Sequence, residues 1–83
     1  MASKILACDG TSLTTEDKMT LQEMQNCVAG YIELVRTPNY PNKVLVVNDE
    51  GRLHGDPINE QASMYAGQPI YGQAILMDRK DLD

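Results

Sequence analysis

Three consecutive polar residues, Asn48, Asp49 and Glu50, carry an amide and two carboxylates that could bind a divalent cation. They follow an aliphatic run and precede Gly51, and residues of these types commonly bond their own backbone in a tight turn. A calcium site takes about six to eight oxygen ligands, and one turn supplies too few. We therefore interpret the segment as a turn, and we expect no metal and no cofactor.

The residue that titrates near neutrality is His54, which makes it a natural first candidate for a general base. It has no recognisable nucleophile partner, because the Ser and Thr residues form no GxSxG motif. No glycine-rich phosphate loop precedes a predicted helix either. We therefore predict a partly exposed strand histidine and a protein that is not an enzyme.

Glu33 lies beside Tyr31 in a strand-like run, and Asn48 and Asn59 could approach it from neighbouring segments. If the carboxylate is buried there, it needs hydrogen-bond donors to satisfy it. Such a cluster could bind a hydroxyl or amine of a ligand, or it could hold a hairpin and a helix against the sheet. We favour the structural interpretation of these four residues.

A basic patch is predicted around the proline-containing loop at residues 37–42. Arg36 and Lys43 flank this loop, and Arg52 follows in a predicted hairpin strand. Tyr40 lies inside the loop, where we expect it to be the most exposed tyrosine and able to stack on a nucleobase. The patch predicts an anionic small molecule as the ligand.

The 83 residues carry a net charge of −5, with four Tyr, five Met and neither Phe nor Trp. A chain this short buries only about 60 to 65% of the surface that its unfolded form exposes, so its core is thin. Chains with such cores often complete them across a subunit interface, and we expect a homo-oligomer. The negative charge repels a phosphate backbone, which argues against general nucleic-acid binding.

The compartment follows from the same composition. No apolar run approaches the roughly 18 residues of a membrane span, and the amino terminus lacks the regions of a signal peptide. Cys8 and Cys27 match no metal-ligand spacing, so we expect two buried, unpaired thiols in a reducing compartment. These features predict a soluble, cytoplasmic protein without membrane contact.

Apolar alternation and turn residues predict a single α+β domain over residues 1–83, with the element order β-α-β-β-β-α-β. The sheet is expected to be mostly antiparallel, with about four to five strands. The predicted strands are 3–8, 31–35, 43–47, a hairpin arm at 52–54, and 68–77 interrupted at Gly72. Residues 11–14 are a candidate for a brief extra strand, and 78–83 for a charged tail that frays.

Local signals place the ends of the first helix. Thr20 and Glu23 fit a capping box, in which each side chain satisfies an exposed amide at the helix start. Gly30 is predicted to be the left-handed residue that stops this helix after Ala29. In the turn that follows the third predicted strand, Gly51 is expected to adopt a positive φ.

The second predicted helix is the segment 59–66. Asn59 is its expected N-cap and Gly67 its C-terminal stop. A competing register has Asp56 as the cap and Pro57 at the first helical position.

Three segments form a combined pattern that is more specific than any one of them: MQNCVAGYIELV at 24–35, LVVNDEGRLHGDPINEQA at 45–62 and IYGQAIL at 70–76. Together they resemble a family of small proteins encoded by phages and their bacterial hosts, known as a domain of unknown function. The residues that match the family pattern are Gly30, Tyr31, Ile32, Glu33, Asn48, Gly51, Pro57, Asn59, Ala62 and Gly72. The match spans residues 21–77, with Asp49 where the family more often has Glu.

The resemblance implies the fold and a phage origin, and it supplies no catalytic residue. Small phage proteins without catalytic machinery commonly act by binding. Our leading hypothesis is therefore an oligomeric sponge for a cyclic nucleotide or a related immune signal. In it, Tyr40 stacks on a base, the basic patch pairs with phosphates, and Asn48 or Asn59 reads polar edges. The alternatives are an acidic inhibitor of a host defence protein and a structural domain without a ligand.

Overall fold

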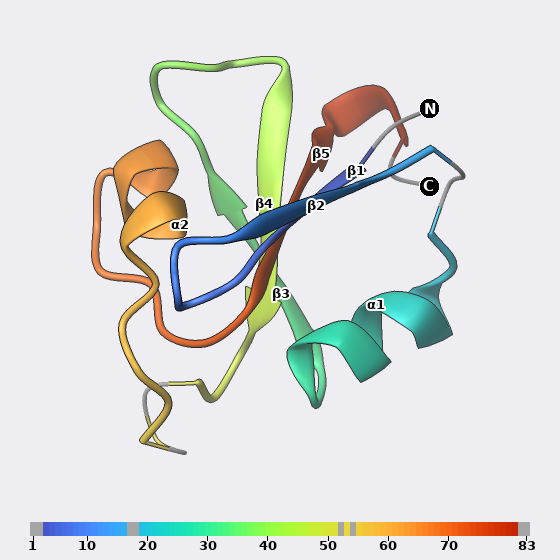
Figure 1. Ribbon diagram of the computed structural model, residues 1–83. Helices are drawn as coiled ribbons and strands as arrows, with labels where there is room; N and C mark the ends of the chain where they lie inside the picture. Colours follow the sequence, from blue (N-terminus) through green and yellow to red (C-terminus); the bar gives the residue numbers. More distant parts are fainter. Residues whose placement is uncertain (1–2, 17–18, 52, 54, 82–83) are drawn as a thin grey trace.

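The computed structural model describes residues 3–16, 19–51, 53 and 55–81 (Figure 1). A five-stranded antiparallel sheet has the strand order β2-β1-β5-β4-β3. The strands are β1 (Ser3–Leu6), β2 (Ser12–Thr15), β3 (Ile32–Arg36), β4 (Lys43–Asn48) and β5 (Ala74–Asp78). The helices are α1 (Leu21–Val28) and α2 (Glu60–Ala66), and a 3-10 turn, η1 (Arg79–Asp81), follows β5. The predicted α+β class and mainly antiparallel sheet are confirmed.

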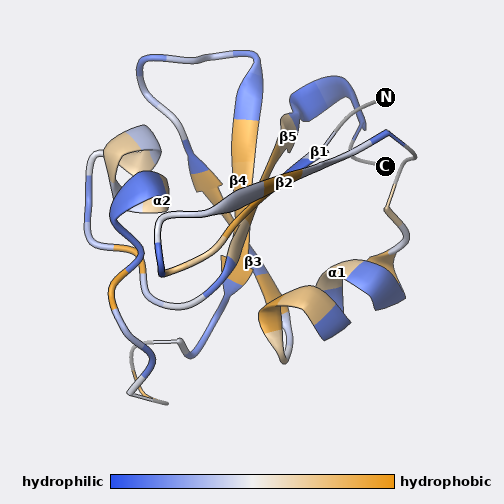
Figure 2. Cartoon of the chain, viewed as in Figure 1, coloured by the Kyte–Doolittle hydropathy of each residue, from blue (hydrophilic) through white to orange (hydrophobic). Residues whose placement is uncertain are grey.

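The two helices lie on opposite sides of the sheet (Figure 1). Successive residues of a strand point to opposite faces, so β4 contributes to two clusters. Val44 and Val46 pack with α1, whereas Leu45 and Val47 pack with α2. A strand buried on both faces reads as a continuous apolar run, which is the character of β4 in Figure 2.

The start of α1 is as predicted, and its end is not. Thr20 Oγ1 accepts a hydrogen bond from Glu23 N (3.1 Å), and Glu23 Oε1 accepts one from Thr20 N (2.9 Å). At the other end Ala29, not Gly30, takes the left-handed conformation, with φ 63°. Gly30 serves a different purpose, because a Cβ there would lie 2.7 Å from Nδ2 of Asn48.

The predicted caps of α2 are confirmed. Asn59 is the N-cap, and Gly67 ends the helix in the left-handed conformation with φ 69°. The competing register that began at Asp56 and Pro57 is wrong.

The predicted hairpin after β4 is not formed in the described residues. Two of its residues, Arg52 and His54, lie outside the part of the chain that the structure describes, and Leu53 between them is in a turn. Both edges of β4 are already paired, one with β3 and the other with β5, so no edge is left for a returning strand. The candidate strand near 11–14 is present instead as β2, which gives the order β-β-α-β-β-α-β.

Gly51 does not adopt the expected positive φ. It is needed because its backbone passes close to another segment: a Cβ at this position would lie 2.8 Å from the carbonyl oxygen of Tyr71. Glycine is therefore required at position 51 by the close packing of two backbone segments, and not by the backbone conformation that we expected.

The last strand begins and ends later than predicted. Gly72, with φ 82°, separates an isolated bridge between Ile58 and Tyr71 from β5. The predicted tail starts inside the sheet, since Asp78 pairs with Lys43 in the β4–β5 ladder. No helix in the described part of the chain is long and apolar enough to cross a membrane.

Candidate functional site

Asn48 connects the end of β4 to the end of α1. Its side chain is buried, with 6% of its surface exposed. Its Nδ2 donates to the carbonyl oxygen of Val28 (2.8 Å), and its Oδ1 accepts from Glu50 N (2.7 Å). The amide therefore serves the backbone and is not available to read a ligand.

Asn59 has a similar role at the start of α2, and its side chain is fully buried. Its Nδ2 donates to the carbonyl oxygens of Leu6 (2.8 Å) and Gly72 (2.9 Å), while Oδ1 accepts from Ala62 N (3.1 Å). These bonds tie α2 to β1 and to the segment that leads into β5. A ligand-reading role for Asn59 is excluded by this burial.

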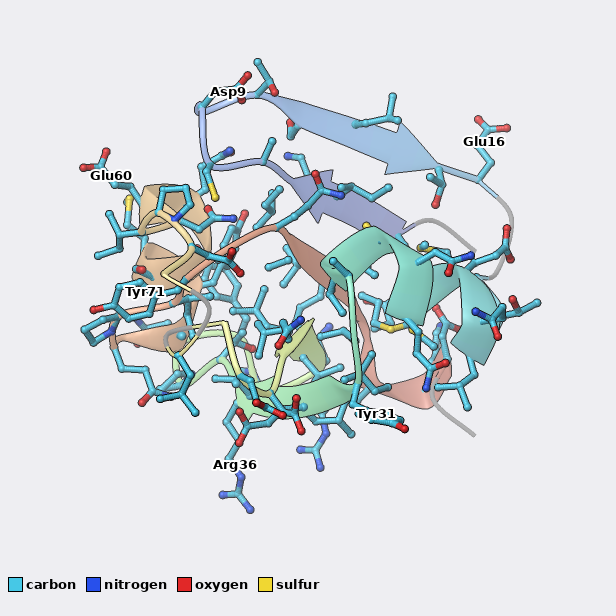
Figure 3. The ribbon with its side chains drawn as sticks, turned by 90° about the horizontal axis from the view of Figure 1, so that it is seen from below. Asp9, Glu16, Tyr31, Arg36, Glu60 and Tyr71 are labelled. Atoms are coloured by element: carbon cyan, nitrogen blue, oxygen red, sulfur yellow. The ribbon has the colours of Figure 1, made fainter. Side chains whose placement is uncertain are left out.

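The four residues of the predicted polar cluster do not come together. Tyr31 exposes 73% of its surface and points outward beside the sheet edge (Figure 3). Glu33 is also exposed and lines an open hollow of about 410 Å³ on the α2 side, which Asp49 and Tyr71 also line. Asn48 borders this hollow, but its hydrogen bonds run to backbone groups, and Asn59 does not line it.

A second hollow, which we call the basic groove, lies beside the 37–42 loop and has a volume of about 350 Å³. Its cations are Arg36 at the end of β3, Lys43 at the start of β4 and Arg79 after β5. Leu34, Pro38 and Val44 are among the residues that give it an apolar wall. Three strand ends meet here, and this is why basic residues far apart in the sequence share one groove.

The loop beside the groove is held by its own hydrogen bonds. Thr37 is buried, and its hydroxyl donates to the carbonyl oxygen of Tyr40 (2.7 Å), with that of Lys43 also within reach (3.1 Å). Arg79 N donates to the carbonyl oxygen of Asn42 (2.9 Å), which ties the turn after β5 to the same loop. The groove therefore has a defined shape without a ligand.

The three cations of the basic groove differ in their partners. Lys43 forms an ion pair with Asp78, its neighbour in the ladder. Arg36 and Arg79 form no ion pair with another described residue, and Arg36 extends away from the molecule in Figure 3. The guanidinium groups are thus the cations that an incoming anion would meet. The sequence does not point to Arg79 as a site residue, because it lies in the segment 78–83 that we expect to be a charged tail.

Tyr40 does not line the basic groove. Its ring lies 5.2 Å from that of Tyr65 with an angle of 55° between the planes, and the two rings line a separate hollow on the α2 side of the loop. Tyr40 exposes 47% of its surface, less than Tyr31, so the expected ranking of the tyrosines was wrong. Arg52, the remaining predicted contact, lies outside the described residues.

The two thiols are unpaired, and both are half-buried where full burial was expected. Cys8 Sγ lies 3.6 Å from the carbonyl oxygen of Pro57, and burial raises the pKa of its thiol. Gln73 Nε2 donates to Cys27 Sγ (2.9 Å). Among the described residues, no group of three or more His, Cys, Asp or Glu side chains is placed to bind a metal ion.

The Lys43–Asp78 pair gives a testable dependence of stability on pH. The hydrogen bond from Lys43 lowers the pKa of Asp78 below its ordinary value of 3.8. This contribution to stability is therefore present above pH 3.8 and is lost as the pH falls through the lowered pKa of the folded state. Urea unfolding at pH 6 and near pH 3 gives the free energy of unfolding at each pH. Between these two pH values it should fall less for Asp78→Asn than for the parent chain. Equal differences would contradict this role.

Comparison with known proteins identifies the family. No curated protein and no solved structure matches the chain. A family model described as a domain of unknown function (DUF3846) matches residues 3–83, which include all five strands and both helices. The chain therefore belongs to the DUF3846 family, a domain of unknown function.

Proposed function

We propose that the protein is a small binding protein that holds a nucleotide-type anion in the basic groove. The observation that carries this proposal is the convergence of Arg36, Lys43 and Arg79 on one groove in a chain of net charge −5. Clustered guanidinium groups without carboxylate partners are a typical arrangement for phosphate, which they bind through two parallel hydrogen bonds.

The groove offers different chemistry along its length. Arg36 and Arg79 belong to different elements, so a phosphate between them would be contacted from two directions. Leu34 and Pro38 provide an apolar surface for a sugar or a base edge. Tyr40 lies on the other side of the loop, so the stacking role assigned to it from sequence does not form part of the proposal.

The biological role we propose is sequestration of a cyclic nucleotide or a related nucleotide-derived immune signal, with no catalytic step. It is supported by the resemblance to phage-encoded proteins and by the basic groove. An acidic inhibitor of a host defence protein is the alternative. Capture from a host lysate distinguishes the two, because a sponge retains a heat-stable small molecule and an inhibitor retains a stoichiometric protein.

Titration calorimetry against cyclic dinucleotides, cyclic trinucleotides and ADP-ribose derivatives tests the proposal. We expect one class to bind, and we expect Arg79→Ala to raise its Kd about tenfold or more, because a charged hydrogen bond contributes roughly 1.5 to 3 kcal/mol. Lys4→Ala is the matched control: it removes the same charge from β1, outside the groove. No heat and no thermal shift with any ligand would contradict the proposal, as would equal losses in the two variants.

A further inference from the structure

One long edge of the sheet is open along β3. β3 pairs with β4 on one side only, and no described strand pairs with its other side. The open side of such a strand carries unpaired N–H and C=O groups, which favour pairing with a further strand. Two of the exposed apolar side chains of the protein, Tyr31 (73% exposed) and Leu34 (51% exposed), lie at this edge.

The backbone groups that face outward can be assigned. Asp49 N donates to the carbonyl oxygen of Tyr31, so Tyr31 and every second residue after it bond to β4. The N–H and C=O groups of Ile32, Leu34 and Arg36 therefore point away from the sheet. These three residues form a regular row of donors and acceptors.

We propose that a second copy of this chain pairs with this edge, β3 against β3, antiparallel about a two-fold axis at Leu34. The pairing joins the two sheets into one of ten strands and keeps the α1 face of one copy continuous with the α1 face of the other. Leu34 then lies opposite Leu34, and Ile32 opposite Arg36, in each case as a hydrogen-bonded pair. The inference does not depend on the proposed ligand.

Other registers are disfavoured by side-chain chemistry. A slip of one residue would place apolar side chains opposite residues of the other face. Centring the axis at Glu33 would bring two carboxylates directly opposite each other. Centring it at Val35 would pair Ile32 with Pro38, which has no N–H to donate. The Leu34 register avoids all three conflicts.

The charges at the two ends of β3 favour an antiparallel partner of the same kind. Arg36 ends β3 beside the basic groove, whereas Asp49 and Glu50 are exposed at the opposite end, next to the start of the strand. Antiparallel pairing brings the Arg36 end of β3 in each copy to the end of the interface where Asp49 and Glu50 of the other copy lie, so ends of opposite charge meet and ends of like charge are kept apart. Each chain has a net charge of −5, but β3 itself contains one acidic and one basic residue. Two paired β3 strands are therefore neutral overall, and the contact between them brings no excess of like charge together.

Sedimentation equilibrium of the full chain over a concentration series tests the dimer. We expect a monomer–dimer equilibrium whose Kd rises at least about tenfold in Leu34→Lys, because two ammonium groups would face each other on the axis. Leu13→Lys is the matched control: Leu13 is 64% exposed on the other edge strand, β2, and its substitution should leave the Kd unchanged.

Amide hydrogen exchange followed by NMR tests the edge itself. In the dimer the amides of Ile32, Leu34 and Arg36 should be protected, and in Leu34→Lys these three should exchange quickly while those of Glu33 and Val35 stay protected. A monomer at every concentration, fast exchange at the three outward amides in the parent chain, or dissociation by Leu13→Lys would overturn the proposal. Because Arg36 and Leu34 line the basic groove as well as the open edge, the dimer is tested by the association of the chain alone, and the ligand is tested at Arg79.

Discussion

Replacing Asn59 with Ala should lower the free energy of unfolding by about 3 to 5 kcal/mol, from the loss of a helix cap and of two buried hydrogen bonds. The buried carbonyl oxygens of Leu6 and Gly72 would lose the donor that Asn59 provides, and Ala62 N would lose its acceptor. A domain of this size has a total stability of roughly 4 to 12 kcal/mol, so the variant should be close to unfolding.

Urea denaturation followed by circular dichroism measures this loss. Asn59→Ser retains an oxygen that can cap α2 but not the two donated bonds, so it should recover about 1 kcal/mol relative to Asn59→Ala. Asn26→Ala is the control, because Asn26 is exposed and accepts only a surface bond from Gln22. A loss below about 1 kcal/mol for Asn59→Ala would show that solvent replaces these bonds.

Asn48→Ala should have the next largest effect, a loss of about 2 to 3 kcal/mol. The carbonyl oxygen of Val28 would lose its partner in a buried contact, and the N–H of Glu50 would lose its partner in a partly buried one. The first of these belongs to the last turn of α1, where carbonyl groups have no partner inside the helix. The expected result is fraying of α1 from its end together with the loss of stability.

Thermal unfolding and amide exchange in α1 measure the two consequences separately. Asp49→Ala is the matched control, since Asp49 is adjacent and exposed, and its effect should stay within about 0.5 kcal/mol. Protected amides at the end of α1 in Asn48→Ala would show that another group holds this helix against the sheet.

The features that sequence predicted well are local ones. The capping box of Thr20 and Glu23 and the caps of α2 at Asn59 and Gly67 depend on residues within one turn of the helix. The aliphatic run of β4 reflects burial on both faces, which is also visible in a single segment. Such signals need no knowledge of where the rest of the chain lies.

The predictions that failed depend on contacts between distant segments. Gly30 must be small because Asn48 approaches it, and the left-handed conformation that we expected there is found at Ala29. Gly51 is fixed by the backbone of Tyr71, which periodicity cannot place beside it. The hairpin predicted from turn residues is absent from the described residues because β5 takes the second edge of β4.

The candidate site was predicted only in part for the same reason. Arg36 and Lys43 flank one loop in the sequence, and both line the basic groove. Arg79 joins them because the β4–β5 ladder brings Asp78 beside Lys43, a pairing across 35 residues. Tyr40 belongs to the same loop as the groove, yet its ring turns to Tyr65 on the other side of it. The positions of these residues in the sequence therefore predict which loop borders the groove. They do not predict which residues of the loop face the groove and which face α2.

The position of β5 has a consequence for the order of folding. β1 and β2 can pair as soon as both exist, and so can β3 and β4, because each pair is joined by a short connection. The two hairpins have no ladder between them until β5 enters, since this strand bonds to β1 on one side and to β4 on the other. Closing such distant pairings is slow, so we expect the centre of the sheet to form last. During synthesis, we therefore expect a chain that has emerged up to α2 to form the two hairpins but not the joined sheet, which requires β5.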